Sequence, residues 1–302
     1  MVIALVIIVF VILAICIASC IIARMIVYGR RQTLDESWQW QQDHVEGTHI
    51  FTRDMFTQYI VKGPKGEDIH TAYLPARIES DKYIILCHGY TDCRYGMMKY
   101  VPQYYELGFH CILFDERGHG ESKPEPCSYG IREIDFPLAV LRDTLERYGR
   151  NIRIGLHGES LGGATMLTML QYDDVKNNVS FAVDDCGFCE IIPVLKGAMK
   201  SLKVPPMFVY PASVAARIMY GISFQKARAI DIVQDNHIPL CCFHGAADDF
   251  ILPEHSKRVY EATKGYKEIH LIEGAGHAES AVVAPEEYGK LLKAFLENIK
   301  FI

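Results

Sequence analysis

The sequence feature that most constrains the fold is the run Gly-Glu-Ser-Leu-Gly at residues 158–162. The preceding residues, 152–157, are mostly apolar and predict a buried strand, whereas the residues from Leu161 onward predict a helix. Two glycines permit a turn too tight for side chains, so Ser160 would project above the sheet beside the free N–H groups of the helix start. This is the pattern of a nucleophile elbow. A glycine-rich turn without catalytic function would have the same sequence, so the rest of the chain must supply a base and an acid.

Predicted strands alternate with predicted helices along the chain, which indicates an α/β fold with a mostly parallel sheet and helices on both faces. The strands are expected at 55–61, 68–74, 83–87, 111–114, 152–157, 179–183, 239–243 and 268–272. The first two flank Gly-Pro-Lys-Gly and predict a hairpin. The helices are expected at 97–107, 131–148, 254–263 and from Pro285 onward. The proline-rich stretch at about 190–235 interrupts the alternation and predicts a mostly helical cap insertion.

The N-terminal stretch predicts a transmembrane anchor over residues 1–24, because no charged side chain occurs before Arg24. About 22 residues at about 1.5 Å each match a hydrocarbon core of about 30 Å. A cleaved signal fits less well, since no Lys or Arg precedes the apolar run. The arginines that follow it favour a single-pass membrane protein with a cytoplasmic catalytic domain. Residues 25–49 are expected to form a juxtamembrane helix or linker, whose tryptophans lie at the bilayer interface or pack on the domain, and 50–302 one α/β domain.

Composition excludes some partners and cofactors. The net charge of −6 gives no basic field, so nucleic acid is not expected as a partner. Several of the ten cysteines fall in predicted buried strands, which suits a reducing compartment. Cys186 and Cys189 form a C-x-x-C pair without a second pair or a histidine at ligand spacing, so neither a metal nor a cofactor is expected.

A candidate acid and base follow the elbow in the order serine, acid, histidine. In a parallel sheet, active-site groups lie on loops beyond the carboxyl ends of the strands. His-Gly-Ala-Ala-Asp-Asp at 244–249 follows one predicted strand, and Gly-Ala-Gly-His at 274–277 follows the next. His277 can take the proton of Ser160, and a carboxylate must fix its imidazole. Asp248, Asp249 and Asp185 are the candidate carboxylates.

These segments, together with Asp-Glu-Arg-Gly-His-Gly-Glu-Ser at 115–122, closely resemble the α/β-hydrolase superfamily over residues 50–302. The helical insertion and the N-terminal anchor resemble its Bem46-type branch and the related serine aminopeptidases. The resemblance implies the α/β-hydrolase fold and places Asp248 at the position of the acid. It also implies an oxyanion hole formed by the backbone N–H groups of Leu161 and of Tyr90, in the His-Gly-Tyr loop.

The residue type at the nucleophile position, 160, indicates which reaction to expect. A dehalogenase or epoxide hydrolase of this fold would carry Asp at position 160, and a dienelactone-type enzyme would carry Cys. Ser160 predicts acyl transfer to water through an acyl-enzyme. The leading hypothesis is a membrane-anchored serine hydrolase of small-molecule or lipid-like carboxylic esters or thioesters. The alternatives are a serine peptidase or aminopeptidase, for which no acidic amine-binding group can be placed, and an anchored scaffold, which a lost triad member would support.

Overall fold

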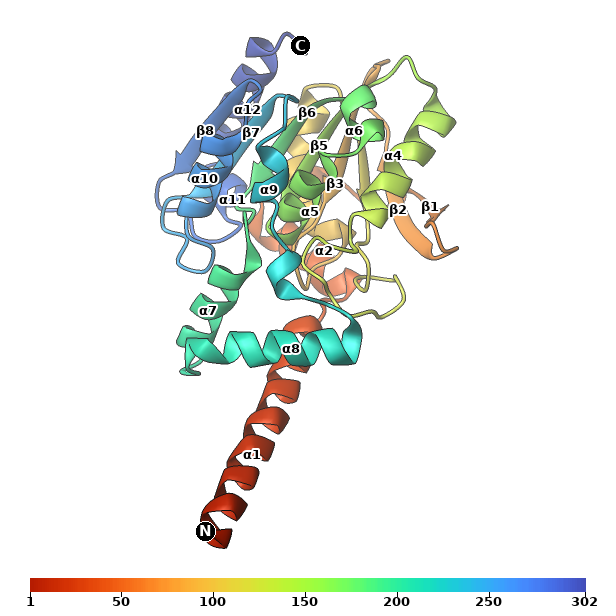
Figure 1. The fold of residues 1–302 in the computed structure, drawn as a ribbon. Helices are drawn as coiled ribbons and strands as arrows, with labels where there is room; N and C mark the ends of the chain where they lie inside the picture. Colours follow the sequence, from red (N-terminus) through yellow and green to blue (C-terminus); the bar gives the residue numbers. More distant parts are fainter.

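The computed structural model describes residues 1–302 and is built on one eight-stranded sheet with the order β1-β2-β4-β3-β5-β6-β7-β8 (Figure 1). The strands are β1 Thr57–Lys62, β2 Asp68–Leu74, β3 Lys82–Cys87, β4 His110–Phe114, β5 Arg153–Glu159, β6 Val179–Asp185, β7 Leu240–Gly245 and β8 Lys267–Ile272. β1 and β2 form the predicted hairpin, β2 pairs antiparallel with β4, and all other pairs are parallel. The predicted mostly parallel sheet is confirmed, with strand ends shifted by no more than two residues.

Helices cover both faces of the sheet because its central strands are apolar on both sides. Alternate residues of β3 point to opposite faces, Ile85 and Cys87 into one apolar layer and Ile84 and Leu86 into the other. The helices around the sheet are α3 Val101–Glu106, α4 Asp135–Tyr148, α5 Leu161–Met169, α6 Asp173–Asn178, α10 Glu254–Ala262, α11 Ser280–Val283 and α12 Pro285–Asn298.

Three details of the helices differ from the prediction. The helix expected at 97–107 starts as a 3₁₀ helix, Arg94–Tyr100, and becomes α-helical only at Val101, where Pro102 lies in the first turn. The helix expected from residue 131 begins at Asp135. The short helices α6 and α11 were not predicted, because four to six residues are too few to show a helical period.

The cap between β6 and β7 is helical, as predicted. It comprises α7 Ile191–Ser201, α8 Val209–Tyr220 and α9 Ile230–Val233, with short 3₁₀ helices at Pro206–Phe208 and Phe224–Lys226. Pro205 and Pro206 follow α7, and Pro206 is the first residue of the short 3₁₀ helix that leads into α8. Figure 1 shows α7 and α8 below the sheet, at the end where α1 meets the domain.

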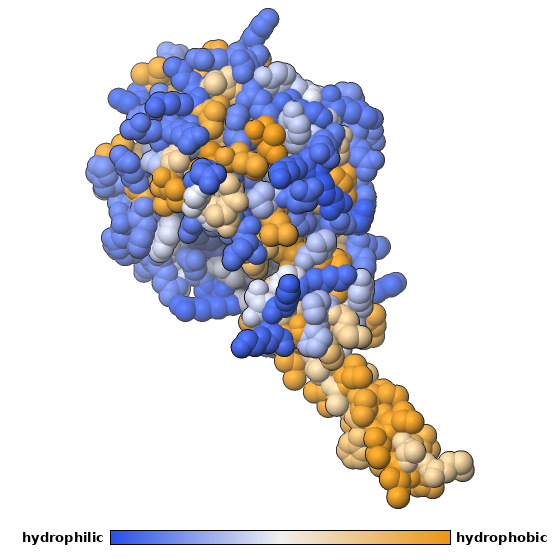
Figure 2. Space-filling view, turned by 90° about the vertical axis from the view of Figure 1, so that its left-hand side faces the viewer, coloured by the Kyte–Doolittle hydropathy of each residue, from blue (hydrophilic) through white to orange (hydrophobic).

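The N-terminal helix α1, Val2–Val27, is long and apolar enough to cross a membrane, and its surface is exposed through Ile17 (Figures 1 and 2). It continues three residues beyond the predicted anchor, and its last turns pack on the cap.

The predicted linker is not a free tether. It contains α2, Leu34–His44, whose start is fixed by a capping box between Thr33 and Glu36. The tryptophans were expected either at the bilayer interface or packed on the domain. Trp38 packs on the domain, edge-on against Phe56 and Tyr95.

Candidate active site

Ser160 lies at the turn between β5 and α5 in a strained backbone conformation, with φ 52° and ψ −110°. Its N–H donates to the Asp185 carbonyl at 2.9 Å, and its carbonyl accepts from the Ala164 N–H at 3.0 Å. A Cβ atom at Gly158 would overlap the Gly162 backbone, and one at Gly162 would overlap the Cys87 carbonyl. Both glycines are therefore required for the turn to close against the sheet.

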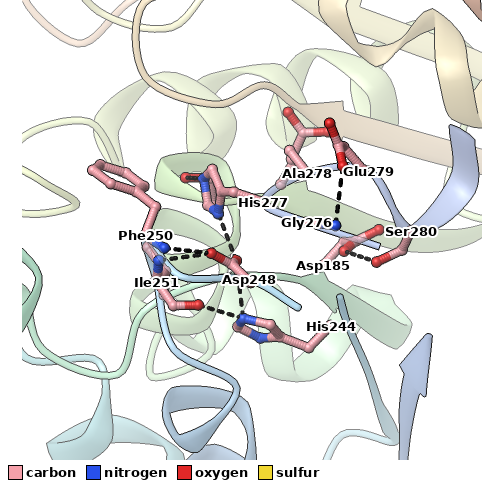
Figure 3. A network of polar contacts seen from close by, with 12 residues as sticks. Asp185, His244, Asp248, Phe250, Ile251, Gly276, His277, Ala278, Glu279 and Ser280 are labelled. Atoms are coloured by element: carbon pink, nitrogen blue, oxygen red, sulfur yellow. Dashed lines mark hydrogen bonds and ion pairs between the residues drawn. The ribbon is translucent and has the colours of Figure 1, made fainter. Parts of the chain in front are cut away.

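The structure brings together the three side chains that the sequence singled out. Ser160 Oγ lies 3.0 Å from His277 Nε2, and His277 Nδ1 lies 2.7 Å from Asp248 Oδ2. The two alternative acids lie elsewhere: Asp249 is exposed, and the Asp185 carboxylate accepts hydrogen bonds from Tyr100 and Ser280. Figure 3 shows His277 above the Asp248 carboxylate, with Asp185 set apart.

Four donors surround the Asp248 carboxylate (Figure 3). Oδ1 accepts from the backbone N–H groups of Phe250 and Ile251, both at 2.9 Å, and Oδ2 faces His277 and, at 3.2 Å, Nε2 of His244. Burial raises the pKa of Asp248, but the bonds from the two histidines and from Ile251 outweigh it and hold the pKa below its usual value. Asp248 is therefore ionised at neutral pH.

His244 is a contact of the site that the sequence did not reveal. Its side chain contacts the Ile251 carbonyl at 2.7 Å and Ser256 Oγ at 2.7 Å, and it also lies 3.2 Å from Asp248 Oδ2. Burial lowers the pKa of His244, but the Asp248 bond and the Ile251 carbonyl raise it above the ordinary value. The only sequence feature that could have indicated this contact is that His244 precedes Asp248 by four positions.

Two free N–H groups flank the serine. Those of Leu161, at the start of α5, and of Tyr90 donate no hydrogen bond within the protein. The loop that carries Tyr90 passes directly against the elbow, because a Cβ at Gly89 would lie 3.5 Å from the Ser160 Cβ. The predicted oxyanion donors thus lie on the two segments that meet at Ser160.

Comparisons with known proteins agree with this architecture. Residues 82–189 match the family model described as the alpha/beta hydrolase fold. The chain has the α/β-hydrolase fold. The superfamily expected from the motifs is thereby supported.

Two solved α/β structures and one relative give the extent of the similarity. An esterase from Pyrococcus furiosus, Pf2001, superposes with a TM-score of 0.66 at 22% identity, over 80% of this chain and 91% of its own. A thermophilic esterase from Thermogutta terrifontis gives a TM-score of 0.57 at 16% identity, over 80% and 99%. The uncharacterized protein YqkD of Bacillus subtilis is 24% identical over 92% of each chain.

A buried ion pair between Lys99 and Glu159 lies next to the turn that carries Ser160 in this α/β-hydrolase fold. Lys99 Nζ lies 2.8 Å from the carboxylate of Glu159, which also accepts from the Tyr100 hydroxyl at 2.7 Å. Lys99 donates in addition to the Ala278 carbonyl at 3.2 Å. The pair therefore connects the residue before Ser160 with the residue after His277.

An apolar pocket of about 280 Å³ opens beside Ser160. Sixteen of its seventeen lining residues are hydrophobic, and no carboxylate is among them. Its walls come from α1, α7, the Tyr90 loop and the loop after Asp248. The α1 wall was not predicted, because nothing in the sequence relates residues 22–26 to the elbow.

Cys186 also lies near the site, with its thiol close enough to Asp248 and His277 for the three groups to surround an ion. Burial raises the pKa of Cys186 well above the usual value, so the free thiol stays protonated at neutral pH. The carboxylate and imidazole of this group are already hydrogen-bonded in the contact chain to Ser160.

Asp184, in β6, is buried beneath the first turn of α5, and neither of its carboxylate oxygens has a hydrogen-bond partner. Burial raises its pKa to about 7; the Asp185 carboxylate adds to this, whereas the nearby His244 opposes it. The folded protein therefore keeps the Asp184 proton in a pH range where the unfolded chain loses it.

Asp184→Asn is expected to raise the free energy of unfolding relative to wild type, increasingly from about pH 4 to about pH 7. In this window wild-type folding takes up a proton, so its stability falls by about 1.4 kcal/mol per pH unit, on the order of 4 kcal/mol in all. The asparagine variant lacks this loss. Denaturant unfolding of both proteins in micelles at pH 5 and pH 8 measures the difference, and a difference that does not change with pH would contradict the assignment.

Proposed function

We propose that the protein is a membrane-anchored serine hydrolase that cleaves carboxylic esters or thioesters through an acyl-enzyme. The observation that carries this proposal is the chain of contacts from Ser160 through His277 to Asp248, at 3.0 and 2.7 Å. Nucleophile and base are within hydrogen-bond reach, and the base is oriented by an ionised acid. The esterase neighbours of the same fold agree with it.

The reaction proceeds in two acyl transfers. Ser160 Oγ attacks the carbonyl carbon while His277 Nε2 takes its proton, and Asp248 stabilises the imidazolium. His277 then protonates the leaving alcohol or thiol as its bond to the acyl carbon breaks. Water, deprotonated by His277, releases the acid and restores Ser160. The N–H groups of Leu161 and Tyr90 donate to the oxyanion in both steps.

The lining of the pocket favours an acyl substrate over a peptide. An aminopeptidase needs an acidic group to hold the substrate amine, and none lines the pocket. A lost triad member would support the scaffold hypothesis, and all three residues are present. The helical cap and α1 favour assignment to the Bem46-type branch.

The membrane part of the proposal rests on α1, which is long and apolar enough to span a bilayer. Three arginines follow its apolar stretch and favour a cytoplasmic catalytic domain. Protease added to intact cells should leave the domain uncut and should cleave it in opened vesicles. Cleavage in intact cells would place the domain outside.

The test of function is a substrate panel applied to the purified full chain, together with a fluorophosphonate probe. Short- and long-chain esters and thioesters should be hydrolysed and the probe should attach to Ser160. Preferential cleavage of aminoacyl amides would indicate a peptidase. A chain that neither turns over any substrate nor reacts with the probe would be a scaffold.

A further inference from the structure

The end of α1 is built into the α/β domain. Ser19, Ala23 and Val27, spaced four residues apart, are its buried side chains, and α8 meets them with small residues of its own. The small residues on α8 are Ala212, Ala215 and Ala216. Small side chains on both helices permit close packing, and Figure 1 shows α8 lying across α1. Because the apolar stretch of α1 ends at Arg24, α8 lies at the level where a membrane would end.

Hydrogen bonds link the C-terminal end of α1 to the loop that carries Tyr90, whose backbone N–H is one of the proposed oxyanion donors. The Tyr90 hydroxyl donates to the Ile26 carbonyl at 2.7 Å and accepts from the Gly29 N–H at 2.7 Å. The Tyr129 hydroxyl also donates to the Ile26 carbonyl, at 2.7 Å. The last turns of α1 therefore have a fixed position relative to Ser160.

These turns form one wall of the pocket beside Ser160. Ile22, Met25 and Ile26 line it from α1, together with residues of α7. Its volume of about 280 Å³ lies just below the range of about 300–1,000 Å³ for small-molecule pockets, and suits one acyl chain rather than two. An acyl chain in this pocket would contact the helix that crosses the membrane.

The outer face of the cap is apolar and basic. Tyr210, Val214 and Ile218 follow one another at four-residue spacing on α8 and are exposed, Ile218 by 80%. Between Glu190 and Asp231 the chain has six basic residues and no acidic one, although the whole protein has a net charge of −6. In Figure 2 the hydrophobic surface of α1 reaches this part of the domain, where apolar and hydrophilic side chains are mixed.

We propose that the outer face of the cap, formed by α7 and α8, rests on an anionic bilayer leaflet. The substrate is then a single-chain acyl ester lipid whose chain passes from the leaflet between α1 and α7 to Ser160. An exposed apolar stripe with flanking basic residues is how a helix lies in a membrane interface, and the continuity with α1 sets its depth. The choice of substrate rests on the proposed hydrolase function, whereas the docking does not.

Docking is tested without any assay of catalysis. The full chain is reconstituted in vesicles of phosphatidylcholine and phosphatidylglycerol with brominated acyl chains, which quench tryptophan on contact. Ile218→Trp should be quenched well beyond the wild-type background. Ile78→Trp should not, because Ile78 is 69% exposed but precedes β3, at the end of the sheet remote from Ser160. Equal quenching of the two variants would overturn the docking.

The pocket wall is tested by a matched pair on α1. Ile22→Trp should lower kcat/KM for a long-chain monoacylglycerol at least about tenfold, and by a larger factor than for a short-chain ester, because the indole fills the part of the pocket that a long chain would occupy. Ile21→Trp, exposed on the same turn, should change neither. Equal effects of both variants would overturn the α1 wall. A wild-type chain that cleaves neither ester would instead overturn the hydrolase function and the substrate with it, while the quenching result would still decide the docking.

Discussion

Replacing Ser160 with alanine is expected to lower kcat for ester hydrolysis by about 10⁶-fold, because in the proposed mechanism Ser160, His277 and Asp248 act as one unit. The variant removes only the Oγ atom that lies 3.0 Å from His277. Alanine can adopt the backbone conformation that serine already holds at this turn, so the fold should remain intact. Residual hydrolysis would come from the oxyanion donors and substrate binding alone.

The measurement compares wild type, Ser160→Ala and Ser201→Ala with a short-chain ester and with a fluorophosphonate probe. Ser201 is exposed at the end of α7 and serves as the control, so its variant should keep full activity and labelling. A Ser160→Ala/His277→Ala double variant should be no slower than Ser160→Ala. Turnover retained by Ser160→Ala would mean that another nucleophile acts.

The sequence was sufficient for the framework of the fold because its local signals agree with one another. The apolar run of β3 is buried on both faces, and the turn from β5 into α5 needs both of its flanking glycines. The order of Ser160, Asp248 and His277 then suffices to bring them together, since parallel strands deliver their following loops to one edge of the sheet.

What the sequence did not reveal depends on contacts between distant segments. Ile22 and Ser160 are far apart in the chain, yet both line one pocket. Only the backbone N–H of Tyr90 was assigned a role, yet its side chain forms hydrogen bonds that hold the end of α1. Lys99 reads as an ordinary surface residue in an amphipathic pattern, but it is buried against Glu159. No periodicity encodes such pairings, because they depend on the tertiary arrangement of helices and loops.

Asp248→Asn is expected to lower kcat by about 10⁴-fold through the tautomer of His277. The backbone N–H groups of Phe250 and Ile251 point at Oδ1, so the amide oxygen of the asparagine would take this position. Its NH₂ group would then face His277 Nδ1 and donate to it. The ring proton would move to Nε2, which faces Ser160 and could no longer accept the serine proton.

The neighbouring carboxylates provide the matched controls for this prediction. Asp249→Asn changes an exposed side chain and should leave kcat unchanged. Circular dichroism should show the same fold for both variants, and fluorophosphonate labelling should slow in Asp248→Asn only. A comparable loss of kcat in Asp249→Asn would assign the role of the acid to Asp249. A loss of kcat in Asp185→Asn, with Asp248→Asn still active, would assign it to Asp185. Because Asp185 contacts Tyr100 and Ser280 instead of His277, its substitution cannot directly change which ring nitrogen of His277 carries the proton.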